Sequence, residues 1–119
     1  MVMRKPIVID RDIDLEKASK ILTKKNISSL IFIKNSQPIG IVTKGDIVRH
    51  FGKKTTVSKI MSKNVLTISP NEKPSNAITI LNENKISVLP VVEEGMLVGV
   101  VSAKDLLYGV CKIDEFLFE

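Results

Sequence analysis

Two segments of the chain, Gly40–Val48 (GIVTKGDIV) and Gly99–Leu107 (GVVSAKDLL), repeat one pattern of residue types. Each has a glycine, two aliphatic residues, a hydroxyl residue, two spacers, an aspartate and further aliphatic residues. The residues able to do chemistry are the hydroxyl and the carboxylate three positions later: Thr43 and Asp46, then Ser102 and Asp105. No acid or base partner accompanies either aspartate in sequence, so the pattern indicates binding rather than catalysis.

Two interpretations of this pattern are open from the residues alone. In the structural one, a hydroxyl three residues before an acid forms a capping box at a helix N-terminus, and nothing else binds there. In the functional one, the free amides and the hydroxyl hold a phosphate, while the aspartate accepts both hydroxyls of a ribose. The occurrence of the pattern twice favours the ligand. The glycine before it, within a strand, indicates a bulge or a close approach by a ligand or a neighbouring helix.

The whole chain repeats itself with an offset of 59 residues, without a gap from Ile9 onward. Identical residues recur along most of the repeat, which chance does not produce. They are Ile9/Ile68, Ala18/Ala77, Ile21/Ile80, Leu22/Leu81, Ile27/Ile86, Ser28/Ser87, Leu30/Leu89, Gly40/Gly99, Val42/Val101 and Asp46/Asp105. The sequence therefore predicts two copies of one structural unit.

Each copy has the same predicted elements, in the order β-α-β-β-α. Asp14 suits the N-cap of the first long helix, and Pro74 suits the first position of the second. The predicted ranges are a strand (5–9, 64–68), a helix (14–26, 73–85), a hairpin (29–43 with its turn at 34–38, 88–102 with its turn at 93–95) and a short helix (Asp46–Phe51, Lys104–Val110).

These elements predict an α+β fold in which two β-α-β-β-α repeats form a sandwich-like pair related by a pseudo-twofold axis. One repeat alone buries too little apolar surface to be stable, so the two are expected to pack together and leave matching clefts. The predicted division is repeat 1 at 1–52, a polar linker at 53–60, repeat 2 at 61–111 and a tail at 112–119.

Composition narrows the class of protein. The chain is 44% hydrophobic and 26% charged, which is typical of folded globular proteins. It has no apolar run of membrane-spanning length, and its start lacks the features of a signal peptide. A single cysteine, Cys111, fits a reducing cytosol, so we expect a cytoplasmic protein. Residues 1–58 hold 12 basic and 5 acidic residues, a positive half that suits either a polyanion or a solvated lysine face.

The segment VLPVVEEGMLVGVVSAKDLL strongly resembles the signature of a CBS domain, and SLIFIKNSQPIGIVTKGDIV is a second copy of it. The resemblance covers nearly the whole chain as a tandem pair, a Bateman module. It implies a regulatory module, not an enzyme, that binds AMP, ADP, ATP or S-adenosylmethionine in clefts between the repeats. It also implies a disc-shaped homodimer and an unidentified protein that the module regulates.

The resemblance assigns roles residue by residue. Asp46 and Asp105 match the ribose-binding aspartates. The residues expected near the phosphate or its equivalent are Thr43, Ser102 and Lys104. Those expected to line the adenine pocket are Ile9, Ile68, Ser28, Ser29, Ser87 and Pro90.

The two copies also differ at residues that matter for these roles. The first copy has Ile31 where the second has Pro90, and Gly45 where the second has Lys104. Arg49 and His50 stand where the second copy has Tyr108 and Gly109. We therefore expect two sites that are not equivalent. His50, the single histidine, has no cysteine or second histidine beside it, so no metal site is predicted.

Three other functions are alternatives to a regulatory module that binds an adenosyl ligand. In a structural or dimerisation module both patterns are only helix caps, and the apolar residues of the tail (Ile113, Phe116, Leu117 and Phe118) pack on the body or on a second chain. Nucleic-acid binding has the basic half in its favour, but the chain has no helix-turn-helix or row of aromatic residues. For an enzyme, the sequence has no nucleophile paired with a base, no metal-ligand cluster, no P-loop and no catalytic cofactor motif.

Overall fold

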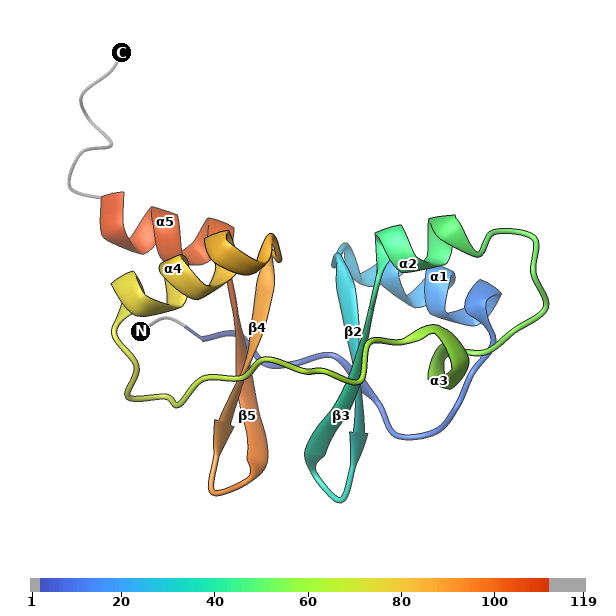
Figure 1. The fold of residues 1–119 in the computed structure, drawn as a ribbon, viewed down its shortest axis with the longest axis horizontal. Helices are drawn as coiled ribbons and strands as arrows, with labels where there is room; N and C mark the ends of the chain where they lie inside the picture. Colours follow the sequence, from blue (N-terminus) through green and yellow to red (C-terminus); the bar gives the residue numbers. More distant parts are fainter. Residues whose placement is uncertain (1–2, 112–119) are drawn as a thin grey trace, which may run out of the picture. The chain divides into compact units, whose positions relative to one another are not determined.

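The computed structural model describes residues 3–111, and side chains up to residue 107 (Figure 1). The elements of the first repeat are β1 (Val8–Ile9), α1 (Leu15–Lys25), β2 (Ser29–Lys34), β3 (Gln37–Thr43), α2 (Lys44–Arg49) and α3 (Val57–Ile60). Those of the second are α4 (Pro74–Asn84), β4 (Val88–Glu93), β5 (Met96–Ser102) and α5 (Ala103–Cys111). The prediction of two repeated modules of mixed helix and strand is confirmed.

The long helices begin where their capping residues predict. The Asp14 carboxylate accepts a hydrogen bond of 2.8 Å from the amide of Lys17 and caps α1, and Pro74 is the first residue of α4. The buried side chains of α1 include Ala18 and Leu22, and those of α4 are Ala77 and Leu81. The apolar spacing that predicts a helix therefore also predicts the face that packs on the sheet.

Each repeat contains an antiparallel hairpin, β2 with β3 and β4 with β5 (Figure 1). The turns are shorter than predicted because two residues suffice when both have positive φ. Asn35 and Ser36 have φ of 53° and 65°, and Glu94 and Gly95 have φ of 52° and 80°. The predicted turns 34–38 and 93–95 were therefore too long, and their outer residues extend the strands.

The strand predicted at the start of each repeat forms only in part. In the first repeat β1 pairs in parallel with β2, Val8 opposite Ile31. In the second, residues 64–68 form no strand, and Ile68 makes a single parallel bridge to Val91. The amide of Ile68 donates to the Pro90 carbonyl at 3.1 Å, and the Val92 amide donates to Ile68 at 2.8 Å. Two hydrogen bonds are enough to hold Ile68 in the core but do not make a strand.

The predicted polar linker at 53–60 contains α3, which packs on the first repeat. Val57 is 1% exposed and belongs to the core of that repeat. Its amide donates to the Ile13 carbonyl at 2.9 Å, and the amide of Ser58 donates to the Asp12 carboxylate at 2.9 Å. Burial raises the pKa of Asp12, but the hydrogen bonds from Ser58, Thr56 and the Ile13 backbone together outweigh this and leave its pKa lowered. The carboxylate is therefore held ionised as an anchor for α3.

The chain forms two compact units, each with its own core. The first unit holds residues 7–65, and the second holds residues 66–111 together with residues 3–6. The N-terminal residues reach the second unit because Arg4 bridges to Val100 of β5. In the first unit the corresponding bridge joins Ser62 to Ile41 of β3. Each outer strand thus carries a short segment from outside its own hairpin.

These added segments explain the two glycines of the repeated pattern. A Cβ at Gly40 would lie 2.7 Å from Cε of Met61, and one at Gly99 would lie 3.2 Å from the carbonyl oxygen of Arg4. A bulge is also present beside each glycine, since the register shifts between Phe32 and Ile33 and again in the second hairpin. The predicted bulges are therefore confirmed, whereas the predicted approach of a neighbouring helix is wrong, because an extended chain segment makes the close contact at each glycine.

Candidate functional site

The first hydroxyl–carboxylate pair is a complete capping box at the start of α2. The Asp46 amide donates to Thr43 Oγ1 at 3.1 Å, and the Thr43 amide donates to Asp46 Oδ2 at 2.9 Å. Because Thr43 is the cap, α2 begins at Lys44, two residues earlier than predicted. The Arg49 guanidinium donates to the other carboxylate oxygen of Asp46. Both oxygens of this carboxylate therefore have partners within its own helix and cap.

In the second pair the hydroxyl also caps a helix, but the carboxylate has a different partner. The Asp105 amide donates to Ser102 Oγ at 3.1 Å, which caps α5. The Asp105 carboxylate accepts two hydrogen bonds from Arg4, Nε to Oδ2 at 2.5 Å and Nη2 to Oδ1 at 2.9 Å. This is a bidentate pair, in which the planar guanidinium matches the two oxygens. The two carboxylates thus differ in the origin of the arginine that each one binds.

Asp105 lies at the edge of the protein rather than inside it. Its side chain is 15% exposed, while that of Arg4 is 71% exposed. The hydrogen bonds from Arg4 lower the pKa of Asp105, burial opposes this, and the hydrogen bond with Ser102 adds to the lowering. The same pair raises the pKa of Arg4. A carboxylate that stays ionised and faces solvent on one side is a suitable acceptor for two ligand hydroxyls.

The lowered pKa of Asp105 predicts a change in acid stability. A group whose pKa is lower in the folded state stabilises the fold above its unfolded pKa of about 3.9, and this stabilisation is lost as the pH falls through the folded value. We expect Asp105→Asn to lose less stability between pH 5 and pH 3 than the wild type does. Urea unfolding across this range measures it, with Asp10→Asn as the control for a more exposed carboxylate. An unchanged pH dependence in Asp105→Asn would contradict the prediction.

The serines predicted to line a pocket lie beside the hydroxyl–carboxylate pairs. Ser29 is paired with Thr43 across the first hairpin, and the Ser28 carbonyl accepts the Lys44 amide at 3.0 Å. In the second unit the Ser87 carbonyl accepts the Ala103 amide at 2.9 Å. The start of the first hairpin strand therefore meets the helix N-terminus in both units.

The apolar residues predicted to line a pocket are part of the cores. Ile9 is 9% exposed and Ile68 is 6% exposed, and the Pro90 side chain is fully buried. Lys104, expected near a phosphate, is exposed at the start of α5. His50 donates through Nδ1 to the carbonyl of Asp46, 2.8 Å away. Among the residues that the structure describes, no group of three or more His, Cys, Asp or Glu residues could hold a metal ion.

Arg4 is the residue that sequence reasoning missed. It lies 101 positions from Asp105, and the offset of the repeat places it opposite Lys63, which gives no hint of a carboxylate partner. Only the bridge between Arg4 and Val100 brings the two together. A basic residue shortly before the first strand is a common feature, so the sequence alone could not identify Arg4 as the partner of Asp105.

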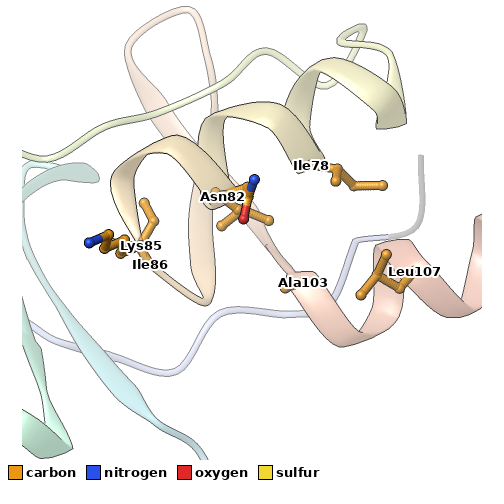
Figure 2. A pocket seen from close by; sticks show the side chains of 7 residues that line it. Ile78, Asn82, Lys85, Ile86, Ala103 and Leu107 are labelled. Carbon is orange, nitrogen blue, oxygen red and sulfur yellow. The ribbon is translucent and has the colours of Figure 1, made fainter.

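A separate groove lies between α4 and α5 in the second unit, with a volume of about 310 Å³ (Figure 2). Its lining is mainly apolar, with Asn82 and Lys85 as its polar members. The full lining is Ile78, Leu81, Asn82, Lys85, Ile86, Ala103 and Leu107. The apolar tail that was expected to pack on the body or on another chain lies outside the described residues. No helix in the described part of the chain is long and apolar enough to span a membrane.

Comparison with known proteins agrees with this architecture. The family model of the CBS domain matches residues 1–53 and 57–111. Inosine-5'-monophosphate dehydrogenase of Thermoplasma acidophilum is 36% identical over 109 residues, which are 90% of this chain and 22% of that protein. The chain spans less than two thirds of the length of the curated relatives it matches first.

Solved structures give the same result. The CBS domain pair of protein MJ0100, crystallised with 5'-methylthioadenosine and S-adenosyl-L-methionine, has a TM-score of 0.83 and 31% identity, covering 92% of this chain and 93% of that one. The CBS domain NE2398 has a TM-score of 0.82 and 25% identity, covering 90% of this chain and 88% of that one. With both family matches in tandem over two repeated units, the chain belongs to the CBS-domain family, as a CBS pair.

Proposed function

We propose that this CBS pair is a regulatory module that binds an adenosyl compound and transmits its occupancy to another polypeptide. The observation that carries the proposal is the pair of capped helices, each with a hydroxyl and a half-buried carboxylate at its N-terminus. The relative MJ0100 was crystallised with two adenosyl compounds, which supports this ligand class. Occupancy acts by favouring the arrangement that binds the ligand more tightly.

In this proposal each ligand contacts the residue types that its chemistry requires. Asp46 and Asp105 accept the ribose hydroxyls. Thr43, Ser102 and Lys104 lie near the phosphate or its equivalent. The backbone around Ser28, Ser29, Ser87 and Pro90, with Ile9 and Ile68 behind it, borders the adenine. The ligand class is AMP, ADP, ATP or S-adenosylmethionine, held as a signal and not as a catalytic cofactor, and the module performs no reaction itself.

A thermal-shift panel tests the proposal. The ligands are AMP, ADP, ATP, S-adenosylmethionine and 5'-methylthioadenosine, with guanosine and inorganic phosphate as controls. A ligand at about 100 times its dissociation constant should stabilise the protein by about 2.7 kcal/mol, which raises Tm by several degrees. A shift with an adenosyl compound and none with the controls supports the proposal. A flat response across the panel, repeated by calorimetry, would contradict it.

The alternative is a structural module that binds no ligand, and one observation favours it. The capping box of Thr43 and Asp46 is complete, and Arg49 already engages the remaining carboxylate oxygen. A flat thermal-shift panel is the result that this alternative requires.

We further propose that the module is a homodimer, with a second copy seated on the groove between α4 and α5. The lining of the groove is mainly apolar, and Leu107 on α5, which is part of this lining, is 50% exposed. An apolar groove at the surface is a typical feature of an interaction surface.

Leu107→Glu is expected to weaken self-association by about tenfold, because the interface would then bury a polar group without a partner. Sedimentation velocity over a concentration series measures this. Val48 on α2, 72% exposed and outside the groove, provides the control Val48→Glu, which should associate like the wild type. Equal association of all three proteins would exclude this groove as the dimer surface.

A further inference from the structure

The carboxylate of Asp105 is already bound, at both oxygens, by a residue from the far end of the chain. Arg4 donates from Nε and Nη2 to the two oxygens of Asp105. Two hydroxyls of a ribose would need the same two acceptors. A ligand that uses Asp105 therefore competes with Arg4 for the exposed edge of this carboxylate.

The backbone of Arg4 is fixed while its side chain is not. Its amide donates to the Val100 carbonyl at 2.8 Å, and its carbonyl accepts the Val100 amide at 2.9 Å. The absence of a Cβ at Gly99 leaves room for this close approach. The side chain is 71% exposed, and Asp105 is its hydrogen-bond partner among the described residues. If a ligand displaces the guanidinium from Asp105, the fixed backbone of Arg4 keeps the guanidinium within reach of the site.

The first unit has no equivalent of this arrangement. Ser62 takes the place of Arg4 on the outer strand, opposite Ile41. Asp46 is held instead by Arg49, three positions further along the same helix. The partner of Asp46 is thus part of the helix that carries it, whereas the partner of Asp105 belongs to a separate segment.

Resting on the proposed function, we propose that Arg4 determines specificity at the second site. Without a ligand it occupies Asp105, and with a ligand it moves to an anionic group that the ligand carries. A neutral nucleoside breaks the pair between Arg4 and Asp105 and has no anionic group that the displaced guanidinium could bind. A nucleotide replaces the carboxylate with a phosphate, which arginine binds at least as well. The second site therefore selects adenosyl ligands with an anionic group over neutral ones.

Calorimetry with AMP and adenosine tests this selection. The background is Asp46→Asn, which keeps a capping oxygen in the first unit but removes its carboxylate, so that binding reports the second site. Arg4→Ala should tighten adenosine binding while AMP binding stays similar or weakens. The preference for AMP over adenosine should fall by about fivefold, the upper range for an exposed ion pair. Arg11→Ala is the control, because Arg11 is also exposed and paired with a carboxylate but lies in the first unit.

The outcomes separate this inference from the proposed function. A preference that falls in Arg4→Ala but not in Arg11→Ala supports it. Binding of both compounds with an unchanged preference in Arg4→Ala overturns the role of Arg4 and leaves the proposed function intact. Equal falls in both variants would show an effect of net charge and would also overturn it. Absence of all adenosyl binding, in the wild type and both variants, would overturn the proposed function and this inference together.

Discussion

Asp105→Asn is expected to weaken adenosyl-ligand binding at the second site by at least about 30-fold. Asparagine has nearly the same size but lacks the charge and offers one acceptor oxygen in place of two. Hydrogen bonds to a charged group contribute about 1.5–3 kcal/mol each, and about 2 kcal/mol corresponds to this change in affinity. Calorimetry in the Asp46→Asn background measures the second site alone.

The controls for this prediction separate the loss of the ribose contact from the effects of lost charge and of altered folding. Asp10→Asn removes the same charge from a side chain that is 72% exposed and lies in the first unit, and it should bind like the wild type. Ser102 still caps α5 in Asp105→Asn, because that bond uses the amide of residue 105. An Asp105→Asn protein that melts normally and binds with wild-type affinity would show that this carboxylate is not the ribose acceptor.

The elements that the sequence predicted well are those set by local interactions. The apolar spacing of α1 and the Asp14 cap lie within one helix, so their pattern is visible in a short window of sequence. The hairpins were predictable because apolar runs flank polar residues. Their turns were not, because Asn35 and Ser36 needed to be recognised as a pair that tolerates positive φ.

The features that the sequence did not predict depend on contacts between distant residues. Composition marks 53–60 as a polar linker, yet one buried side chain, Val57, fixes it to the first core. Residues 64–68 have strand-like composition but make a single bridge. A short window cannot show whether a partner strand is within reach, so tertiary contact overrides propensity at both places.

The candidate site shows the same division. The pairs Thr43/Asp46 and Ser102/Asp105 were found from sequence because spacing of three residues places each at one helix N-terminus. Non-equivalence of the two was also predicted, from Gly45 opposite Lys104. That prediction stays untested, but the structure shows a difference between the two carboxylates that the sequence did not indicate: the origin of the arginine on each. This difference arises because Arg4 bridges to β5 in the second unit, whereas Ser62 bridges to β3 in the first. Comparison of the two repeats in the sequence cannot reveal these bridges.

Leu89→Ala and Leu30→Ala form a matched pair with large expected effects on stability. The two leucines occupy the same position in the two repeats, on β4 and β2, and are 0% and 1% exposed. Truncating a buried leucine to alanine costs about 2–5 kcal/mol, because the lost contacts add to the cost of the cavity. A loss near 3 kcal/mol is a large share of the stability of a small domain. Chemical unfolding of both variants measures it.

The location of the damage tests the division into two units. The second unit includes residues 3–6, so Leu89→Ala should speed amide exchange at Arg4 and Val100, which bond one another. Leu30→Ala should instead speed exchange at Ile41 and Ser62 of the first unit. Separate patterns mean that the repeats open independently, so that a ligand can stabilise one without the other. Identical patterns would mean one cooperative unit, and the N-terminal residues could not be assigned to the second repeat. The role proposed for Arg4 requires that residues 3–6 belong to the second unit. The amide-exchange measurement therefore also tests the basis of the specificity proposed for the second site.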